Sequence, residues 1–292
     1  MSFERVLITG GGGALASDLA QRLDGRGEVA ARSHAELDVS DPAALEAAFG
    51  ELEPTLVLNC AAAHNAEVCE AEPELAFAVN SAAVQRLARH SAQTGATLVT
   101  VSTNYVFDGE RPEPYGEDEP PGPRSVYSIS KLAGEHAALA YAPGALVVRT
   151  AGLFGLCGSA AKGGNFVTRI LERGRERGTL QVVADQLLTP TFTADLAEAI
   201  IGAVEAGVAG RLHLTNSGSC SWHEFTEAIV ELAGLEVPVE AIATEQERGG
   251  GRPLNGVLAR PRADAAGLPA LRPWRDALAD YMQRAGLAAV SA

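Results

Sequence analysis

The segment Tyr127-Ser128-Ile129-Ser130-Lys131 sets a phenol and an ammonium group four residues apart. Residues at this spacing lie on one face of a helix. A nearby ammonium favours the tyrosinate form, so it would lower the pKa of Tyr127. A phenol tuned in this way can protonate a carbonyl oxygen while hydride reaches the carbonyl carbon. The chain has only two lysines, Lys131 and Lys162, so chance is a weak explanation of the pair.

A hydroxyl group that could assist this protonation of a carbonyl oxygen lies upstream, in Val101-Ser102-Thr103-Asn104. This segment ends an apolar run that we predict to be a strand, and ligands bind at the carboxyl ends of strands in parallel sheets. The Thr103 hydroxyl could donate a hydrogen bond to the same carbonyl oxygen. Ser102 is the alternative donor, and ordinary polarity at a strand end would explain both residues without any chemistry.

Four consecutive glycines, Gly10 to Gly13, follow a short β-branched run and precede a helical pattern. With Ala14, Leu15 and Ala16 they satisfy both G-x-G-x-x-A and G-x-x-G-x-x-A. In this context glycines permit a tight turn and the close approach of a pyrophosphate, and the helix N-terminus directs amide groups at the phosphates. A glycine-rich turn without a ligand is the alternative.

About twenty residues after the glycines, where the acidic residue of NAD-binding proteins is expected, the chain reads Ala30-Ala31-Arg32-Ser33-His34. An acidic residue would bind the ribose 2′-hydroxyl of NAD, whereas an arginine with a hydroxyl suits a 2′-phosphate. The sequence therefore favours NADP(H) over NAD(H), with Arg32 and Ser33 at the phosphate. A solvated surface arginine is the competing interpretation.

Strand and helix patterns alternate through the first half of the chain, which is typical of βαβ units around a parallel sheet. We predict strands at 5–9, 29–31, 55–59, 96–102 and 145–150, and helices at 15–23, 41–49, 73–94 and 126–141. After residue 150 the alternation loosens. Helices are expected at 166–177, 194–205, 222–233 and 275–285, and strands at 182–185 and 211–215. A loop is expected at 153–165, and a loop with short strands at 245–262. This half is expected to form a smaller α+β region.

The composition excludes several classes of protein. The 292 residues have a net charge of −14 and no basic run, so nucleic acid and anionic membranes are poor partners. No apolar run reaches the roughly 18 residues that a membrane span needs. The polar start of the chain is unlike a signal peptide, so we expect a cytoplasmic protein. Four cysteines and six histidines show no ligand spacing, so no metal is expected.

Longer stretches resemble the dTDP-4-dehydrorhamnose reductase family of the extended short-chain dehydrogenase/reductase superfamily. Residues 102–109 read STNYVFDG and are similar to a family motif whose third residue is usually Asp. Further similar segments begin at Glu72, Asn165, Asp185, Arg252 and Pro273. The resemblance therefore covers nearly the whole chain.

This resemblance implies an α/β fold with two domains. A Rossmann-type doubly wound parallel sheet would occupy residues 1–151, with about 186–207 returning to it, and a smaller C-terminal α+β substrate domain would occupy 152–292. The implied function is an NAD(P)H-dependent oxidoreductase that reduces a 4-keto-6-deoxy sugar nucleotide similar to dTDP-4-dehydrorhamnose. A homodimer is left open.

The resemblance also implies roles for individual residues. Tyr127 would be the proton donor, Lys131 would hold the nicotinamide ribose, and Thr103 would polarise the carbonyl. The residues expected at the cofactor are Tyr127, Lys131, Gly10, Gly11, Gly12, Gly13, Ala14, Leu15, Arg32, Ser33, Asp38, Val39, Ala61, Ala62, Ala63, Asn80 and Val101. Those expected at the substrate are Thr103, Asn104, Gly152, Asn165 and Arg252.

Three departures from the family pattern lie on the substrate side. Many members have a sugar-contacting tryptophan where this chain has Gly152, the usual Asp is Asn104, and the loop at 64–70 lacks the usual Val-Asp. The exact sugar nucleotide is therefore open. So are two other functions: a sugar-nucleotide epimerase or dehydratase, and a non-catalytic NADP-binding subunit similar to the beta subunit of methionine adenosyltransferase. The lack of an acidic pair after Thr103 counts against a dehydratase.

Overall fold

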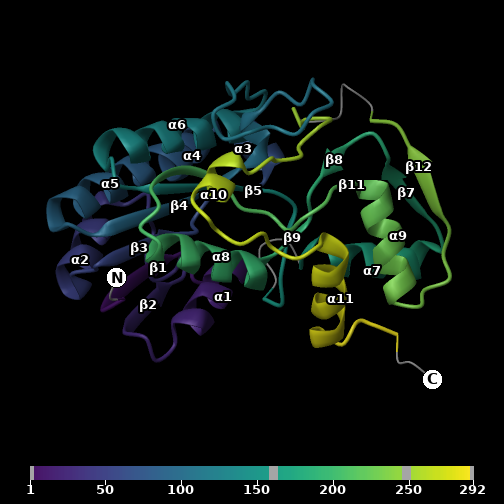
Figure 1. Ribbon diagram of the computed structural model, residues 1–292, viewed down its shortest axis with the longest axis horizontal. Coiled ribbons are helices and arrows are strands. Elements are labelled where there is room, and N and C mark those ends of the chain that lie inside the picture. Colours follow the sequence, from purple (N-terminus) through teal and green to yellow (C-terminus); the bar gives the residue numbers. More distant parts are fainter. Residues whose placement is uncertain (1–2, 158–163, 245–250, 290–292) are drawn as a thin grey trace.

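A six-stranded parallel sheet forms the centre of the larger lobe in the computed structural model, which describes residues 3–157, 164–244 and 251–289 (Figure 1). The strands are β1 (Arg5–Thr9), β2 (Glu28–Arg32), β3 (Leu56–Asn59), β4 (Thr97–Thr103), β5 (Leu146–Thr150) and β10 (Gly210–His213), in the order β10-β5-β4-β3-β1-β2. From β1 the chain passes to β2 on one side and then to β3 on the other. Ligands bind at such a reversal of strand order.

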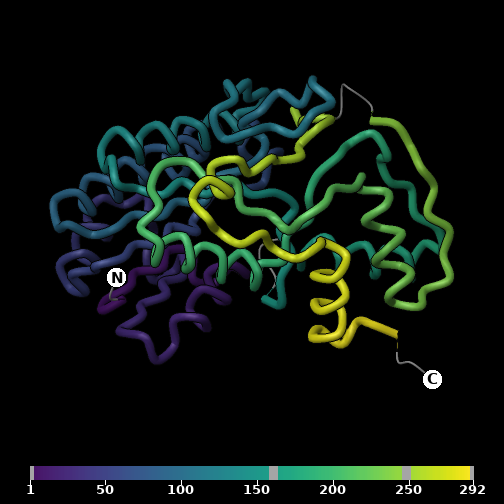
Figure 2. The backbone as a smooth tube through the Cα atoms, in the orientation of Figure 1, coloured from purple at the N-terminus to yellow at the C-terminus, as the bar shows by residue number. Residues whose placement is uncertain are grey.

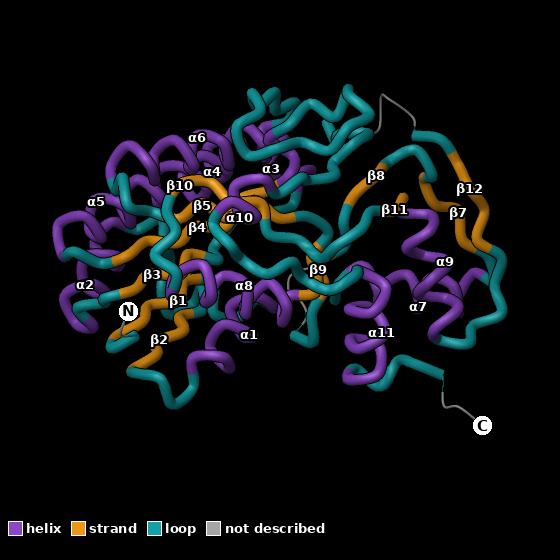
Figure 3. The backbone as a smooth tube through the Cα atoms, viewed as in Figure 1, coloured by secondary structure: helices purple, strands orange, loops and turns teal. Residues whose placement is uncertain are grey.

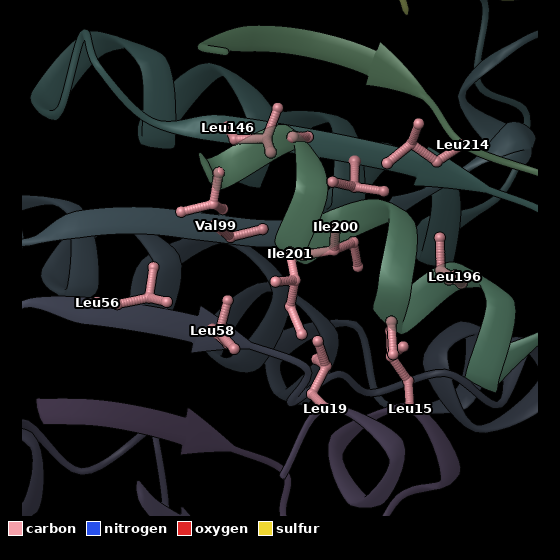
Figure 4. Packing of buried hydrophobic residues seen from close by; sticks show 14 of the residues in the cluster. Leu15, Leu19, Leu56, Leu58, Val99, Leu146, Leu196, Ile200, Ile201 and Leu214 are labelled. Carbon is pink, nitrogen blue, oxygen red and sulfur yellow. The ribbon is translucent and has the colours of Figure 1, made fainter. Parts of the chain in front are cut away.

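Helices cover both faces of this sheet. On one face α1 (Ala14–Leu23) packs beside α8 (Thr193–Glu205), and on the other lie α2 (Pro42–Leu52), α5 (Ala83–Thr94) and α6 (Val126–Tyr141). Figure 4 shows the first layer, where Leu19 of α1 and Ile201 of α8 meet strand residues such as Leu58. Burying a side chain of this size stabilises the fold by about 1.5–3 kcal/mol. The predicted Rossmann-type fold class is confirmed.

Side-chain caps set the limits of several helices. Asp41 accepts a hydrogen bond from the Ala43 amide at 2.9 Å, and Pro42 begins α2. Ser125 and Ser128 form a capping box at the start of α6, which places the start of that helix where the sequence predicted it.

Two helical segments differ from the prediction. The helix expected over 73–94 consists of α4 (Pro73–Phe77), the π-helical turn η1 (Ala78–Ala82) and α5. Most of the segment 64–70, which we assigned to a loop, belongs to α3 (Ala66–Ala71), because the Asn65 side chain accepts hydrogen bonds from the Glu67 and Val68 amides.

A smaller lobe contains three helices around an aromatic core (Figures 1 and 3). The helices are α7 (Phe166–Arg177), α9 (Trp222–Leu232) and α11 (Trp274–Arg284). Three strand pairs accompany them: β7 (Leu180–Val183) with β12 (Val239–Ile242), β8 (Leu187–Leu188) with β11 (Cys220–Ser221), and β6 (Leu153–Phe154) with β9 (Thr191–Phe192). The expected loops at 153–165 and 245–262 lie partly outside the described residues, and the first of them begins with β6 because residues 153–154 pair with β9.

The chain passes between the lobes several times (Figure 2). After β5 it enters the smaller lobe, and it returns to the larger one with α8 and β10. It returns again with α10 (Pro261–Ala265), whose Ala263 is buried in the core of the larger lobe. The strand that we placed in the smaller region at 211–215 therefore belongs to the central sheet as β10, because it pairs in parallel with β5.

Two further features complete the fold. A single 3₁₀ turn, η2 (Asn104–Val106), follows β4 directly. Across the described ranges, no helix combines the length and the apolar character needed to cross a membrane.

Candidate active site

The segments selected from the sequence meet at one edge of the central sheet. Parallel pairing aligns Thr9 with Arg32 and Asn59, and it aligns Thr103 with Thr150. The carboxyl ends of these strands therefore lie together, and Figure 3 shows that they face the smaller lobe. Ligands of open α/β sheets bind at this edge.

The glycine loop after β1 is shaped by close backbone contacts. Gly10 has a φ of +71°, and a Cβ there would lie 2.9 Å from the Ala61 backbone nitrogen. A Cβ at Gly11 would lie 2.9 Å from the backbone carbon of Ala31. A Cβ at Gly12 would meet no atom within 4 Å. Gly10 and Gly11 therefore let the loop lie directly against β3 and β2, while Gly12 faces open space.

The first turn of α1 presents its amide groups to the same edge. Gly13 is the N-cap residue and offers no side chain to the amides of the first turn, which includes Ala14 and Leu15. Ala16 is fully buried where the helix packs on the sheet. This arrangement leaves the N-terminus of α1 suited to an anionic group.

Arg32 and Ser33 begin the turn that follows β2. The Gly11 amide donates a 2.7 Å hydrogen bond to the Arg32 carbonyl oxygen, so this turn adjoins the glycine loop. The Arg32 side chain is exposed. Both the amide and the hydroxyl of Ser33 donate to the Glu36 carboxylate. Sequence reasoning missed Glu36, although S-x-x-E is a known capping pattern.

Two expected cofactor residues, Asp38 and Val39, have internal partners for their side chains. The Ser40 amide and hydroxyl donate to Asp38 Oδ1 at 2.9 and 2.7 Å and hold the pKa of Asp38 below its usual value. The Val39 side chain is buried in the core under α2 and α5.

Asn80 holds the loop that follows β3. It is fully buried in η1, and its side chain exchanges two hydrogen bonds with the Ala63 backbone, at 3.0 and 2.9 Å. It also donates to the Ser130 hydroxyl of α6 at 3.0 Å. Asn80 thus holds the loop that contains Ala61–Ala63 in place, and its expected contact with the cofactor stays a prediction.

Tyr127 and Lys131 lie on α6 beside the end of β4. The Lys131 Nζ atom donates a 2.6 Å hydrogen bond to the Val101 carbonyl oxygen, and Tyr127 shares a hydrogen bond with the Thr103 hydroxyl. The ring of Tyr105 meets that of Tyr127 edge-on, with centroids 6.1 Å apart. The three residues predicted to be catalytic are therefore brought together.

Burial controls the protonation of this pair. It raises the pKa of Tyr127 above the usual value, and the hydrogen bond with Thr103 opposes that change only in part. The lowered Tyr127 pKa that we expected from Lys131 is therefore wrong for the chain as described. Burial also lowers the pKa of Lys131 to about 8, although Glu135 and Cys60 act in the opposite direction.

A buried ion pair joins Arg149 to Glu135, which lies one helical turn after Lys131 on α6. Glu135 accepts hydrogen bonds from the Ser102 hydroxyl at 2.5 Å and from Arg149 Nε and Nη2 at 2.9 and 2.7 Å. Arg211 contacts the same carboxylate at 3.3 Å. Burial acts to raise the pKa of Glu135, but Arg149, Ser102 and Arg211 together outweigh it and the pKa is lowered. Sequence reasoning missed this pair, whose signals were an arginine in an apolar strand and a glutamate four residues after Lys131.

A small pocket opens beside this site. Its lining residues come from η2, from the segment after β5, from β8, α9 and the segment after residue 251, and they are Asn104, Tyr105, Gly152, Gln186, Leu187, Leu188, Trp222 and Pro253. Gly152 has a φ of +54°, and a Cβ there would lie 2.7 Å from Leu188 Cδ1. Leu188 therefore fills the space beside Gly152, and the aromatic side chains that line the pocket are Tyr105 and Trp222.

Asn104 lines this pocket, and Arg252 directly precedes the lining residue Pro253. The Asn104 side-chain nitrogen donates to the Gly256 carbonyl oxygen at 3.0 Å, a bond that an aspartate could not donate. The exposed Arg252 guanidinium lies close enough to Tyr105 to oppose the burial that raises the pKa of that phenol. Arg252 thus places positive charge near Tyr105, which lines the pocket.

Asn165, which we expected at the substrate, is not among the residues that line this pocket. Its side chain caps α7 by accepting from the Thr168 amide, and its nitrogen donates to the Gly155 carbonyl and the Tyr281 hydroxyl at 2.9 and 2.8 Å. Both ends of this amide are therefore used within the protein, and we leave Asn165 out of the site. Among the described residues, no three His, Cys, Asp or Glu side chains are grouped to hold a metal ion.

The chain is similar to known proteins over nearly its whole length. Residues 4–286 match the family model of the RmlD substrate binding domain. The chain is 39% identical over 287 residues to dTDP-4-dehydrorhamnose reductase of Streptomyces griseus, covering 94% of this chain and 92% of that protein. It is 40% identical over 283 residues to a probable dTDP-4,6-dihydroxy-2-methyloxan-3-one 4-ketoreductase of Streptomyces antibioticus, covering 94% and 93%.

A solved structure agrees closely with the whole fold. The crystal structure of dTDP-4-dehydrorhamnose reductase from Bacillus anthracis in complex with NADP matches with a TM-score of 0.90 and 32% identity. The match covers 96% of this chain and 99% of that one.

Proposed function

The chain belongs to the dTDP-4-dehydrorhamnose reductase family, and we propose that it is an NADPH-dependent oxidoreductase that reduces the 4-keto group of a dTDP-linked 6-deoxy sugar. The contact between Tyr127 and Thr103 beside Lys131, at the edge of the sheet where ligands bind, supports this function best. A phenol and a hydroxyl that share one hydrogen bond can both face one carbonyl oxygen.

The larger lobe fits a dinucleotide. Gly10 and Gly11 bring the loop against the sheet, a Cβ at Gly12 would enter open space, and the first turn of α1 has no side-chain cap. A pyrophosphate would be held by these amides. Arg32 and Ser33 would face the adenosine ribose, and Ala61–Ala63 would lie behind the cofactor.

Each residue of the proposed catalytic set has a separate task. When bound, the reduced nicotinamide supplies hydride to the carbonyl carbon. The raised pKa of Tyr127 keeps its phenol protonated near neutral pH, and the phenol then donates its proton to the carbonyl oxygen. Thr103 donates a hydrogen bond to the same oxygen. The Lys131 ammonium stabilises the tyrosinate that is left.

The pocket beside η2 is the proposed sugar site. Trp222 offers an aromatic face to an apolar sugar surface, and Tyr105 and Asn104 bring polar groups to it. The positive charge of Arg252 suits a nucleoside diphosphate, which a chain of net charge −14 must attract with local cations. Relatives whose names specify different sugars match this chain at similar identity, 39% and 40%, so we propose a class of sugar nucleotide and not a single sugar.

Consumption of NADPH by the purified chain tests the function. A dTDP-linked 4-keto-6-deoxy sugar is compared with its UDP- and GDP-linked counterparts, and the product is separated and identified. We expect one NADPH to be consumed for each dTDP-sugar reduced. Binding of NADPH without consumption on any nucleotide sugar would favour a non-catalytic NADP-binding subunit. A new sugar isomer formed without consumption would favour an epimerase.

A further inference from the structure

The turn after β2 contains an internal carboxylate where an anionic group of the cofactor is expected. Glu36 Oε2 accepts hydrogen bonds from the Ser33 amide at 2.8 Å and from the Ser33 hydroxyl at 2.7 Å. These two bonds, with a smaller contribution from the Arg32 guanidinium, hold the pKa of Glu36 below its usual value. Glu36 is therefore negatively charged at neutral pH, and its side chain is exposed.

This turn is fixed against the glycine loop. The Gly11 amide donates to the Arg32 carbonyl at 2.7 Å, and the Glu36 and Leu37 amides donate to the Ser33 carbonyl at 3.1 and 2.9 Å. In a dinucleotide-binding fold, the residues that follow the second strand meet the adenosine ribose. Arg32 and Ser33 are thus the groups that a 2′-phosphate would meet, and both donors of Ser33 already bind a carboxylate oxygen.

We infer that Glu36 occupies the subsite for the 2′-phosphate of NADPH. It thereby weakens the binding of NADPH and reduces the factor by which this chain prefers NADPH to NADH. The inference rests on the proposed function, because it concerns the cofactor of that reaction. A 2′-phosphate must displace the like-charged carboxylate before it can bind Ser33. The 2′-hydroxyl of NADH is neutral and can donate a hydrogen bond to the carboxylate where it lies.

A purely structural role for Glu36 makes a different prediction. An S-x-x-E pair stabilises the turn whichever cofactor is bound. Its removal would then change the affinities for NADPH and NADH by the same factor. The ratio of the two dissociation constants therefore separates a specificity-determining residue from a cap.

Calorimetric titration of NADPH and NADH provides the test. The variants are Glu36→Gln, which keeps the size of the side chain, and Glu36→Ala, which removes it. Glu46→Gln is the matched control, because Glu46 is an exposed glutamate of α2. Both Glu36 variants should bind NADPH about tenfold more tightly, while the affinity for NADH stays the same or falls. The gain should shrink as salt is added, because exposed charges are screened.

The fragments 2′,5′-ADP and 5′-ADP give a second readout that needs no catalysis. Glu36→Gln should tighten the first and leave the second unchanged. An unchanged ratio of dissociation constants in both Glu36 variants, or a shift as large in Glu46→Gln, overturns the inference while leaving the proposed function intact. A wild-type chain that binds neither NADPH nor NADH overturns both.

Discussion

The Lys131 ammonium nitrogen lies 2.6 Å from the Val101 carbonyl oxygen, and this hydrogen bond joins the middle of α6 to the end of β4. Tyr127 lies one helical turn before Lys131, and Thr103 lies two residues after Val101. The bond therefore fixes the separation of the phenol and the hydroxyl that would share one carbonyl oxygen. Lys131 is 5% exposed, and this burial disfavours the charged form of its amine.

That burial predicts how Lys131 changes stability with pH. The folded pKa of Lys131 is about 8, below the ordinary value of 10.5. Between these two pH values the unfolded chain binds more protons than the folded one, so Lys131 makes the free energy of unfolding rise with pH. Relative to Lys131→Met, the wild type should gain about 3 kcal/mol across this range. Urea unfolding of both proteins measures the difference at each pH, and a constant difference would contradict the prediction.

The buried pair of Glu135 and Arg149 should be essential to the larger lobe. Both side chains are about 1% exposed, so Glu135→Gln leaves an unpaired buried guanidinium and should lower the free energy of unfolding by about 3–5 kcal/mol. The double variant Glu135→Gln/Arg149→Met should recover part of that loss. Glu198→Gln, which breaks an exposed pair with Arg22, is the control and should cost about 1 kcal/mol or less. Equal losses at the buried and exposed pairs would show the prediction to be wrong.

The glycine loop offers a matched pair of substitutions. Gly10→Ala forces a Cβ to within 2.9 Å of the Ala61 nitrogen at a φ of +71°, and it should destabilise the chain by about 1–3 kcal/mol. Gly12→Ala adds a Cβ in open space and should change stability by about 0.5 kcal/mol or less. Thermal unfolding of the two variants compares them directly. A Gly12→Ala chain as unstable as Gly10→Ala would disprove this account of the loop.

Most of the larger lobe could be predicted because its signals are local. The β-branched runs, the Asp41 and Ser125 caps and the Tyr127–Lys131 spacing each depend on a few neighbouring residues. The place of β10 could not be predicted in this way, because its partner β5 lies far away in the sequence and parallel pairing leaves no local mark.

Site residues that depend on distant contacts were also harder to predict. Asn165 belongs to a family motif, yet its side chain is used by Gly155 and by Tyr281, which lies 116 residues away. Gly152 stands where many family members have a sugar-contacting tryptophan, but Leu188 approaches from β8 and fills the space beside it. In both cases the sequence identifies the residue itself. The contacts that decide its role come from segments far away in the chain, so the sequence alone could not predict them.

Trp222 should matter for the substrate and not for the cofactor. It lines the pocket with Gly152, while its ring packs against Phe166 with centroids 4.5 Å apart. Trp222→Ala should raise the KM for the sugar nucleotide about tenfold, a loss of about 1.4 kcal/mol, and leave the Kd of NADPH unchanged. Trp222→Phe keeps an aromatic face and should show a smaller effect. Steady-state kinetics and titration measure the two constants, and an unchanged KM in Trp222→Ala would refute this role.

The central claim is that the Tyr127 phenol donates the proton in the reduction. The most direct measurement is the turnover of Tyr127→Phe with NADPH and the dTDP-linked keto sugar, beside Tyr141→Phe, which alters an exposed tyrosine at the end of the same helix. We predict that Tyr127→Phe lowers kcat by about 10²–10⁴-fold while NADPH still binds, and that Tyr141→Phe retains wild-type turnover. Wild-type turnover in Tyr127→Phe would contradict the account.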